Sequence, residues 1–287
     1  MRILFKRGPG AVTSVDFHLQ LNHNDSWNMS RLHFHDYNEL LLPLTSPGNI
    51  FVSDQIYPLR RGTLYLIGEN TLHRTMATGA HARYVLHISQ KTLGQLSTPQ
   101  TDLTPLGRDA FRQAPLSGQS LNHLTELFQN LERNKNDGSF GSDTRQTWAL
   151  LELLLCVVPI FRMSTAGESI CNKDFLRVSP ILDYIRQNLT KPLTLDQIAG
   201  EFYISKHYLC RIFKAATGFP VMEYIIYSRI LKARQLLQEG VSVQQAGELS
   251  GFSDNSHFIR TFGHLTGTSP GRYARDYQSS DQILLNN

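Results

Sequence analysis

Four side chains in the first third of the chain are of types that bind metals or polar ligands: His33, His35, Glu39 and His73. Residues two apart on a strand point to the same side, so His33 and His35 can both face the interior of a sheet. Imidazole and carboxylate groups suit zinc, iron, manganese or nickel. Buried polar groups are more commonly satisfied by hydrogen bonds. We therefore predict a hydrogen-bonded cluster with neither a metal nor another cofactor.

A second set of side chains lies on two helices expected in the last third of the chain. Arg211 and Arg260 occupy equivalent places in an internal repeat, and arginine can donate two hydrogen bonds to one guanine. Polar neighbours on the same helix faces can reach bases or phosphates. The full set predicted to contact nucleic acid is Lys206, His207, Cys210, Arg211, Lys214, Asn255, Ser256, His257 and Arg260.

The elements that carry this second set repeat after 48 residues. Thr194-Leu-Asp-Gln197 and Ser242-Val-Gln-Gln245 both have the form of a capping box, so a helix is expected to begin at each. Each leads into a tight turn and a longer helix, ending in LCRIFKAATG (209–218) and FIRTFGHLTG (258–267). A short helix, a turn and a longer helix make a helix-turn-helix unit, whose second helix enters the major groove of DNA.

The spacing and the charge of this region both favour double-stranded DNA. A helix of about 20 residues, about 30 Å long, is predicted from Pro220 to Gly240. That length is close to the ~34 Å of one turn of B-DNA. Residues 178–275 contain eleven Lys or Arg and seven Asp or Glu, so the whole formal excess of +4 lies there. A positive surface is expected to favour an anionic partner.

The elements that must position the first set are short strands separated by turn residues. Their regular spacing is typical of a small β-barrel or sandwich. Residues 91–117 are polar and are predicted to form a loop. Two helices then form a hairpin, and the second is apolar around most of its circumference, so it needs burial on more than one side. The predicted strands are 38–44, 49–52, 55–59, 64–67 and 83–88, and the helices are 118–134 and 144–163.

Composition excludes several classes of protein. The 287 residues suffice for two domains. Cys156, Cys171 and Cys210 form no pair with metal-site or redox spacing, so free thiols are expected. No apolar run reaches the ~18 residues of a membrane span, and no signal peptide is recognised, so a cytoplasmic protein is predicted. No GxSxG, P-loop or HExxH motif is present, so we expect no enzyme.

Residues 178–277 resemble the DNA-binding domain of the AraC/XylS family of bacterial transcription regulators. The match rests on LTLDQIAGEFYISKHYLCRIFKAATGFP, YSRILKARQLLQEG and GFSDNSHFIRTFGHLTGTSPGRY. The chain departs from the family at Ala246-Gly247, where Ile-Ala is common, so weaker packing is expected in the second unit. Gly263 and His264 replace residues that are often basic, which is expected to reduce phosphate contact.

The N-terminal half is similar to the cupin-like sensor domain of the same family, over RLHFHDYNELLLPL and LRRGTLYLIGENTLHR. The four residues His33, His35, Glu39 and His73 have the ligand spacing of metal-binding cupins. The resemblance implies a barrel that senses a small molecule. Arg83 is a further candidate for a polar pocket. The predicted effector-binding residues are Arg31, His33, His35, Tyr37, Glu39, Tyr65 and His73.

These observations predict two domains. An all-β cupin-like barrel with a helical hairpin forms the sensor and dimerisation domain, and an all-α domain binds DNA through two helix-turn-helix units joined by a long helix. The predicted bounds are 1–163 for the first domain (barrel 1–95, hairpin 118–163), 164–174 for a linker and 175–287 for the second, with units at 194–217 and 242–266 and the joining helix at 220–239.

The resulting hypothesis is a cytoplasmic, sequence-specific transcription activator. Its expected partners are promoter DNA, RNA polymerase (implied by the resemblance), a small-molecule effector and a second copy of the chain, bound through the hairpin near Leu153. Two alternatives stay open. One is a cupin-type metal-dependent enzyme with a helical appendage, and the other is a DNA-binding regulator without a ligand.

Overall fold

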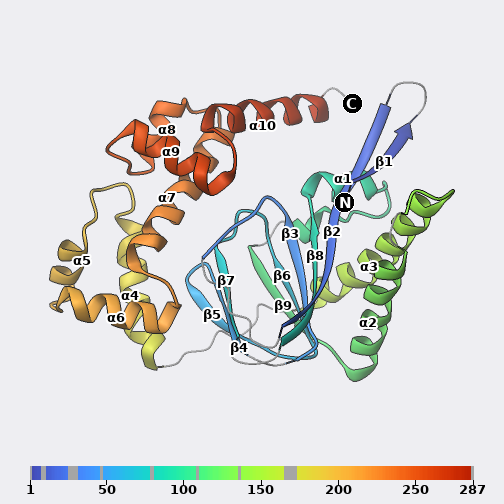
Figure 1. Ribbon diagram of the computed structural model, residues 1–287, viewed down its shortest axis with the longest axis horizontal. Helices are drawn as coiled ribbons and strands as arrows, with labels where there is room; N and C mark the ends of the chain where they lie inside the picture. The colour runs from blue at the N-terminus through green and yellow to red at the C-terminus, as the bar shows by residue number, and fades with distance from the viewer. Residues whose placement is uncertain are drawn as a thin grey trace. The chain divides into compact units, whose positions relative to one another are not determined.

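The computed structural model describes residues 2–7, 11–24, 32–45, 48–77, 81–107, 110–134, 137–164 and 173–285 (Figure 1). The chain divides into two compact units. The first comprises Met1–Ser30 and Phe34–Ile170, and the second comprises Arg31–His33 and Cys171–Asn287. Most of the predicted linker, 164–174, lies outside the described residues, so its bounds stay a prediction.

The first unit contains nine described strands in two antiparallel sheets. The larger sheet has the order β1-β2-β8-β3-β6-β9 and the smaller has the order β5-β4-β7. The strand bounds are β1 Arg2–Arg7, β2 Ala11–Asn24, β3 Asn38–Pro43, β4 Gly48–Val52, β5 Gln55–Leu59, β6 Thr63–Ile67, β7 His73–Ala77, β8 His81–Ile88 and β9 Phe111–Pro115.

The predicted cupin-like barrel is not closed, because among the described residues no hydrogen-bonded ladder joins one sheet to the other. The strands β7 and β5 end the smaller sheet, while β1 and β9 end the larger one. The two sheets are instead packed face to face as an open sandwich. One apolar cluster contains residues of both sheets. Leu41, Tyr65 and Val85 come from the larger sheet, and Ile50 and Val52 come from the smaller sheet.

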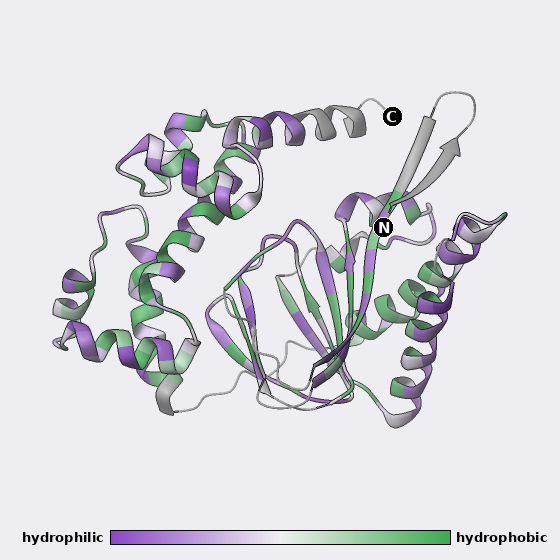
Figure 2. Cartoon of the chain, in the orientation of Figure 1, coloured by the Kyte–Doolittle hydropathy of each residue, from purple (hydrophilic) through white to green (hydrophobic). Residues whose placement is uncertain are grey.

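The larger sheet is buried on both faces, since alternate residues of a strand point to opposite sides. Leu40 and Leu42 of β3 belong to a second apolar cluster, which includes Phe128 of α2 (Gly118–Arg133) and Leu150 of α3 (Ser142–Met163). Figure 2 shows hydrophobic residues along both of these helices. The helical hairpin therefore covers the face of the sheet that is turned away from the smaller sheet.

The helix α3 is long and apolar enough to cross a membrane by length and composition alone, contrary to the sequence analysis. Leu150, Leu153, Leu154 and Val157 are all 0% exposed. They lie in the core that the hairpin shares with the sheet. The core helix of a folded domain meets the same test, and this burial accounts for the apolar composition of α3.

The prediction of a loop over residues 91–117 is wrong in three places. The helix α1 (Gln90–Leu96), a short 3-10 helix (Thr104–Gly107) and β9 lie there. The Thr92 hydroxyl donates to the backbone oxygen of Asp16, which is 76 residues away, and β9 pairs with β6. These elements depend on partners distant in the chain, so local pattern could not reveal them.

The second unit contains seven described helices. The helices α5 and α6 lie where the first helix-turn-helix unit is predicted, α7 lies where the long joining helix is predicted, and α8 and α9 lie in the second. The bounds are α4 Lys173–Gln187, α5 Leu195–Glu201, α6 Lys206–Thr217, α7 Val221–Gln238, α8 Val243–Leu249, α9 Asn255–Thr266 and α10 Pro270–Leu285.

Candidate nucleic-acid interface and histidine cluster

The caps and the buried residues of helix α6 fix which of its faces points to the core and which to solvent. The Ser205 hydroxyl accepts a hydrogen bond from the backbone N–H of Tyr208 (3.2 Å) and so caps the first turn. Gly218 ends the helix in the left-handed conformation at φ 84°. Leu209 and Phe213 are buried at 0% exposed. These contacts fix which residues face solvent.

The outward face of α6 carries the predicted contacts. Lys206, His207, Arg211 and Lys214 are exposed, and Cys210 is half-buried. The Arg211 guanidinium lies 5.2 Å from the centre of the Tyr208 ring, and the ring orients it along the helix surface. Lys206 forms an exposed ion pair with a carboxylate of α5, at 2.8 Å.

The helix α9 presents a second face of the same kind. The Asp254 carboxylate caps it by accepting from the backbone N–H of His257 (2.6 Å). Phe258 and Phe262 are 0% exposed, which directs the polar residues away from the core. The predicted contacts on α9 are all exposed: Asn255, Ser256, His257 and Arg260.

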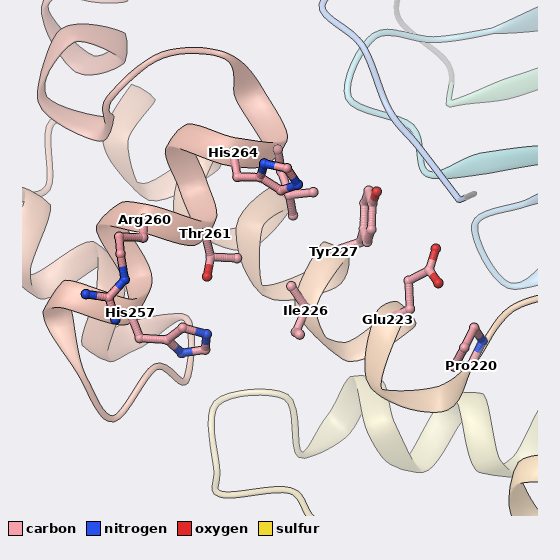
Figure 3. Close-up of a pocket in the computed structure, with 9 residues that line it drawn as sticks. Pro220, Glu223, Ile226, Tyr227, His257, Arg260, Thr261 and His264 are labelled. Carbon is pink, nitrogen blue, oxygen red and sulfur yellow. The ribbon is translucent and has the colours of Figure 1, made fainter. Parts of the chain in front are cut away.

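A groove of about 600 Å³ lies between α7 and α9 within this unit. Figure 3 shows that Ile226 and Tyr227 come from α7, while His257, Arg260 and His264 come from α9. Arg260 therefore borders this groove as well as standing on the exposed face of its helix. The groove gives Arg260 open space on one side.

Two arginines counted in the positive excess have structural roles. Arg229 donates to the backbone oxygens of Leu189 (3.0 Å) and Lys191 (2.8 Å). Arg234 is 3% exposed, and its Nε and Nη2 donate to the Tyr273 hydroxyl, both at 3.1 Å. Burial lowers the pKa of both guanidinium groups. For DNA binding, the exposed positive charges on α6 therefore matter more than the total number of Lys and Arg residues in this unit.

The expectation of weak packing at Ala246-Gly247 is corrected by the structure. Ala246 is 0% exposed, and a Cβ added at Gly247 would lie 2.8 Å from Cδ1 of Phe258. The Phe258 ring fills the space that a side chain at 247 would need. At the equivalent place the first unit has the smaller Leu209, opposite Ile198 and Ala199. The smaller side chains of α8 are thus compensated by a larger side chain, Phe258, on α9.

The second candidate site lies between the two sheets of the first unit. The Oε2 atom of Glu39 lies 3.1 Å from Nε2 of His35, 2.9 Å from Nε2 of His87 and 3.7 Å from Nε2 of His73. Glu39 and His87 face each other across the β3–β8 pair. The smaller sheet contributes His73 from β7, opposite Val52 of β4. Strand register therefore brings His73 and His87 to Glu39, and the segment just before β3 adds His35.

Burial and hydrogen bonding set the charges in this cluster. Burial raises the pKa of the Glu39 carboxyl, but hydrogen bonds from His35, His73 and His87 outweigh it, so the net pKa lies well below its usual value. Burial also lowers the pKa of Arg83 to about 10, against the opposing effect of Glu39. Glu39 is therefore a buried carboxylate that remains charged.

The other predicted effector-binding residues have different positions. The Tyr37 ring stacks on that of His87, with centroids 6.2 Å apart. Tyr65 is 0% exposed, lies in the apolar cluster between the sheets and donates its hydroxyl proton to the Pro58 carbonyl (2.6 Å). His33 groups with the second unit and is not placed relative to this cluster. Arg31 lies outside the described residues.

Sequence reasoning missed His87. Its signal was present in β8, where His81, Arg83 and His87 alternate with Tyr84, Leu86 and Ile88. The apolar residues of this alternation face the helical hairpin. A polar set at period two on a strand whose other face is apolar indicates a functional face.

The family profile that matches this chain agrees with the geometry of the second unit. The profile of the family described as "Helix-turn-helix domain" matches residues 198–276. YfiF of Bacillus subtilis, an uncharacterized HTH-type transcriptional regulator, is 26% identical over 261 residues, which are 87% of this chain and 80% of YfiF. The HTH-type transcriptional activator RhaS of Escherichia coli O1:K1 is 25% identical over 83% of this chain and 85% of RhaS. The crystal structure of ToxT from Vibrio cholerae O395 is 14% identical and covers 90% of this chain and 96% of that chain, with a TM-score of 0.36.

The two capped helix pairs and the matching profile define a helix-turn-helix transcription regulator. The match falls within residues 178–277, which resemble the DNA-binding domain of the AraC family, and the relatives named above are HTH-type transcriptional regulators.

Proposed function

We propose that the chain is a cytoplasmic, sequence-specific transcription activator that reads promoter DNA with α6 and α9. One observation carries the proposal: two helices at equivalent places in a repeat bury their apolar faces and expose the predicted polar residues. Helices of this kind place their N-terminal residues in the major groove. The name of RhaS, a transcriptional activator, supports activation, which would require RNA polymerase as a further partner.

The roles of individual residues follow from their chemistry. Arg211 and Arg260 read guanine, because a guanidinium can donate to both O6 and N7 of that base. Lys214 is a point charge one turn further along α6, where it neutralises a phosphate. The remaining contacts on both helices adjust register or recognise neighbouring bases.

The test is DNA selection with the full-length chain from a pool of random duplexes, followed by titration of the selected duplex and a scrambled one. We expect the selected duplex to bind at least about 10³-fold more tightly at physiological salt. The affinity for both duplexes should fall as salt rises, because bound cations are released from the DNA. Equal affinity for both duplexes at every salt concentration would refute sequence-specific recognition.

We further propose that the first unit senses a small molecule in the polar region around Glu39 and that a second copy of the chain binds its hairpin. The alternative of a metal-dependent enzyme is less favoured, because the relatives are transcription regulators. A thermal-shift screen of sugars, fatty acids and aromatic acids distinguishes a ligand-sensing regulator from one without a ligand. A ligand of the folded state raises the melting temperature, whereas a regulator without a ligand shows no such rise.

The dimer is proposed to form through an apolar stripe on α3. Trp148 is 70% exposed and Leu155 is 51% exposed, and the half-buried Leu151 lies between them on the same face. Leu153, the position at first expected in the interface, is 0% exposed and belongs to the core. A charge at position 153 would unfold the unit, so it cannot serve as an interface probe.

The interface test uses Leu155→Glu, with Lys91→Glu as a control that changes an exposed charge on α1, away from the stripe. Analytical ultracentrifugation should show a dimer for the unmodified chain and for the control, and a folded monomer for Leu155→Glu. An unmodified chain that is monomeric at micromolar concentration, both alone and on DNA, would rule out the dimer.

A further inference from the structure

Ile259 is an apolar residue on the polar surface of α9. Phe258 and Phe262, two other apolar residues of the same helix, are both 0% exposed, whereas Ile259 is 40% exposed. In the sequence the three residues have the spacing of one apolar face, but the structure places only two of them in the core. An apolar side chain gains free energy when it is removed from water. A partner that covered Ile259 would therefore gain affinity from it.

The geometry of the helix places Ile259 among the proposed base contacts. Residues three and four positions apart are neighbours on a helix surface. Ile259 follows Ser256 by three positions and Asn255 by four, and both of these residues are exposed. The helix begins at Asn255, so Ile259 lies in its second turn. In a helix-turn-helix unit, this end of the second helix is the part that meets base edges.

Gly263 lies four residues after Ile259, on the same side of the helix. A Cβ added at Gly263 would lie 3.9 Å from the Thr268 carbonyl oxygen, which is an ordinary contact, so packing does not require glycine there. Glycine is unfavourable within a helix, but it lets a ligand approach the backbone closely. At this position no side chain stands between Ile259 and a base in the groove.

The major groove of DNA offers one apolar group to such a residue. The base edges carry hydrogen-bond donors and acceptors, and thymine adds a C5-methyl group. The isoleucine side chain has neither a donor nor an acceptor, so it cannot satisfy the polar groups of any base. An apolar side chain among the base contacts therefore matches the thymine methyl group and no other feature of the base edges.

We propose that Ile259 contacts the C5-methyl group of a thymine close to the guanine read by Arg260, and that this contact selects thymine at that position. The proposal rests on the proposed function, because it requires α9 to lie in the major groove. It adds a specificity-determining residue that does not belong to the predicted set of DNA contacts.

The equivalent position of the first unit is occupied by Cys210, 49 residues earlier and next to Arg211. Cys210 is half-buried, and its side chain is shorter than that of isoleucine. The methyl contact is therefore assigned to α9. This helix has Arg260 as its one Lys or Arg, so an apolar contact supplies recognition where the positive charge is low.

The experiment uses the full-length chain and the duplex obtained by DNA selection. Each thymidine of the duplex is replaced in turn by deoxyuridine, which lacks only the C5-methyl group and keeps the same base pairing. Fluorescence anisotropy measures Kd for each duplex. For one thymidine near the guanine whose recognition depends on Arg260, we expect binding to weaken about fourfold, the effect of losing one buried methyl group.

Two variants and a control connect this effect to Ile259. Ile259→Ala removes the apolar side chain beyond Cβ and favours the helix, so the protein should remain folded by circular dichroism. It should bind the thymidine and deoxyuridine duplexes equally. Ile259→Val keeps a branched apolar side chain and should keep part of the difference. The control Leu176→Ala shortens a 54% exposed side chain of α4 and should keep all of it.

Two results would overturn the proposal. One is a selected duplex in which no thymidine is sensitive to loss of its methyl group, and the other is an Ile259→Ala protein that keeps the sensitivity of the unmodified chain. Either result leaves sequence-specific recognition standing if the unmodified chain still prefers the selected duplex to the scrambled one. Equal affinity for the selected and scrambled duplexes refutes the proposed function, and the role of Ile259 with it.

Discussion

The first helix-turn-helix unit, α5 and α6, and the second, α8 and α9, begin and end their helices with the same kinds of residue. Thr194 and Ser242 cap the short helices, Ser205 and Asp254 cap the longer ones, and Gly218 and Gly267 end those. The exposed faces differ, because α6 carries three basic residues and α9 has Arg260 as its one Lys or Arg. The two units therefore share the residues that define their helix ends but differ in the charge of the face proposed to contact DNA.

The turn between the two helices also has the same backbone conformation in both units but different surroundings. Tyr203 in the first unit and Gly251 in the second, 48 residues apart, both have a positive φ, at 53° and 96°. Tyr203 is 96% exposed, so its side chain meets no obstacle. A Cβ at Gly251 would lie 2.4 Å from the Leu189 carbonyl oxygen. One turn therefore tolerates a side chain, and the other packs too closely against its neighbour to accept one.

Gly251→Ala is expected to have the largest effect, destabilising the second unit by about 3 kcal/mol. The cost combines a left-handed conformation with a backbone clash. The matched control is Gly267→Ala, at φ 73° with no atom of the described residues within 4 Å of the added Cβ, which should cost about 1 kcal/mol. Urea denaturation measures both. Equal losses would show that φ alone, and not the close packing, distinguishes the turns.

The difference in charge predicts how each unit contributes to DNA binding. Arg211→Ala and Arg260→Ala should each weaken the selected duplex by about 1–3 kcal/mol and affect the scrambled duplex little. Lys214→Ala should weaken both duplexes and reduce the salt dependence by about one cation. Fluorescence anisotropy at several salt concentrations separates these outcomes. Identical behaviour of the Arg and Lys variants would remove the distinction between base and phosphate contacts.

The exchange of volume between α8 and α9 can be tested by reversing it. Gly247→Ala should destabilise the second unit by about 1–2 kcal/mol, because the added Cβ meets the Phe258 ring at 2.8 Å. Phe258→Leu in the same chain restores the pairing of the first unit and should recover part of the loss. The free energies of unfolding of the two single variants and the double variant measure this coupling. Strictly additive losses would contradict the exchange.

Tyr203→Gly is expected to have the smallest effect, a stabilisation of up to about 1 kcal/mol. Glycine adopts a positive φ without the cost that a side chain carries, and the exposed ring gives up little packing. Hydrogen exchange of the α5 and α6 amides measures the local change. A loss of protection would show that Tyr203 makes a stabilising contact.

The helix-turn-helix units could be predicted from the sequence because their signals are local. A cap and its partner lie three residues apart in Thr194-Gln197 and Ser242-Gln245, and the apolar period of α6 and α9 repeats within four residues. The exposed set on both helices follows from that period alone. The expectation of weak packing at Ala246-Gly247 failed because the compensating residue, Phe258, lies on the other helix.

The sequence by itself determined which residues form the two DNA-reading helices and which of their faces is polar, because a helix is specified by contacts between residues a few positions apart. Only the tertiary structure decided that the first unit is an open sandwich, that Leu153 is buried and that His87 joins His35, Glu39 and His73. Paired residues of β3 and β8 are forty or more residues apart in the chain. The register of such pairs is set by burial of whole faces, which no local pattern contains.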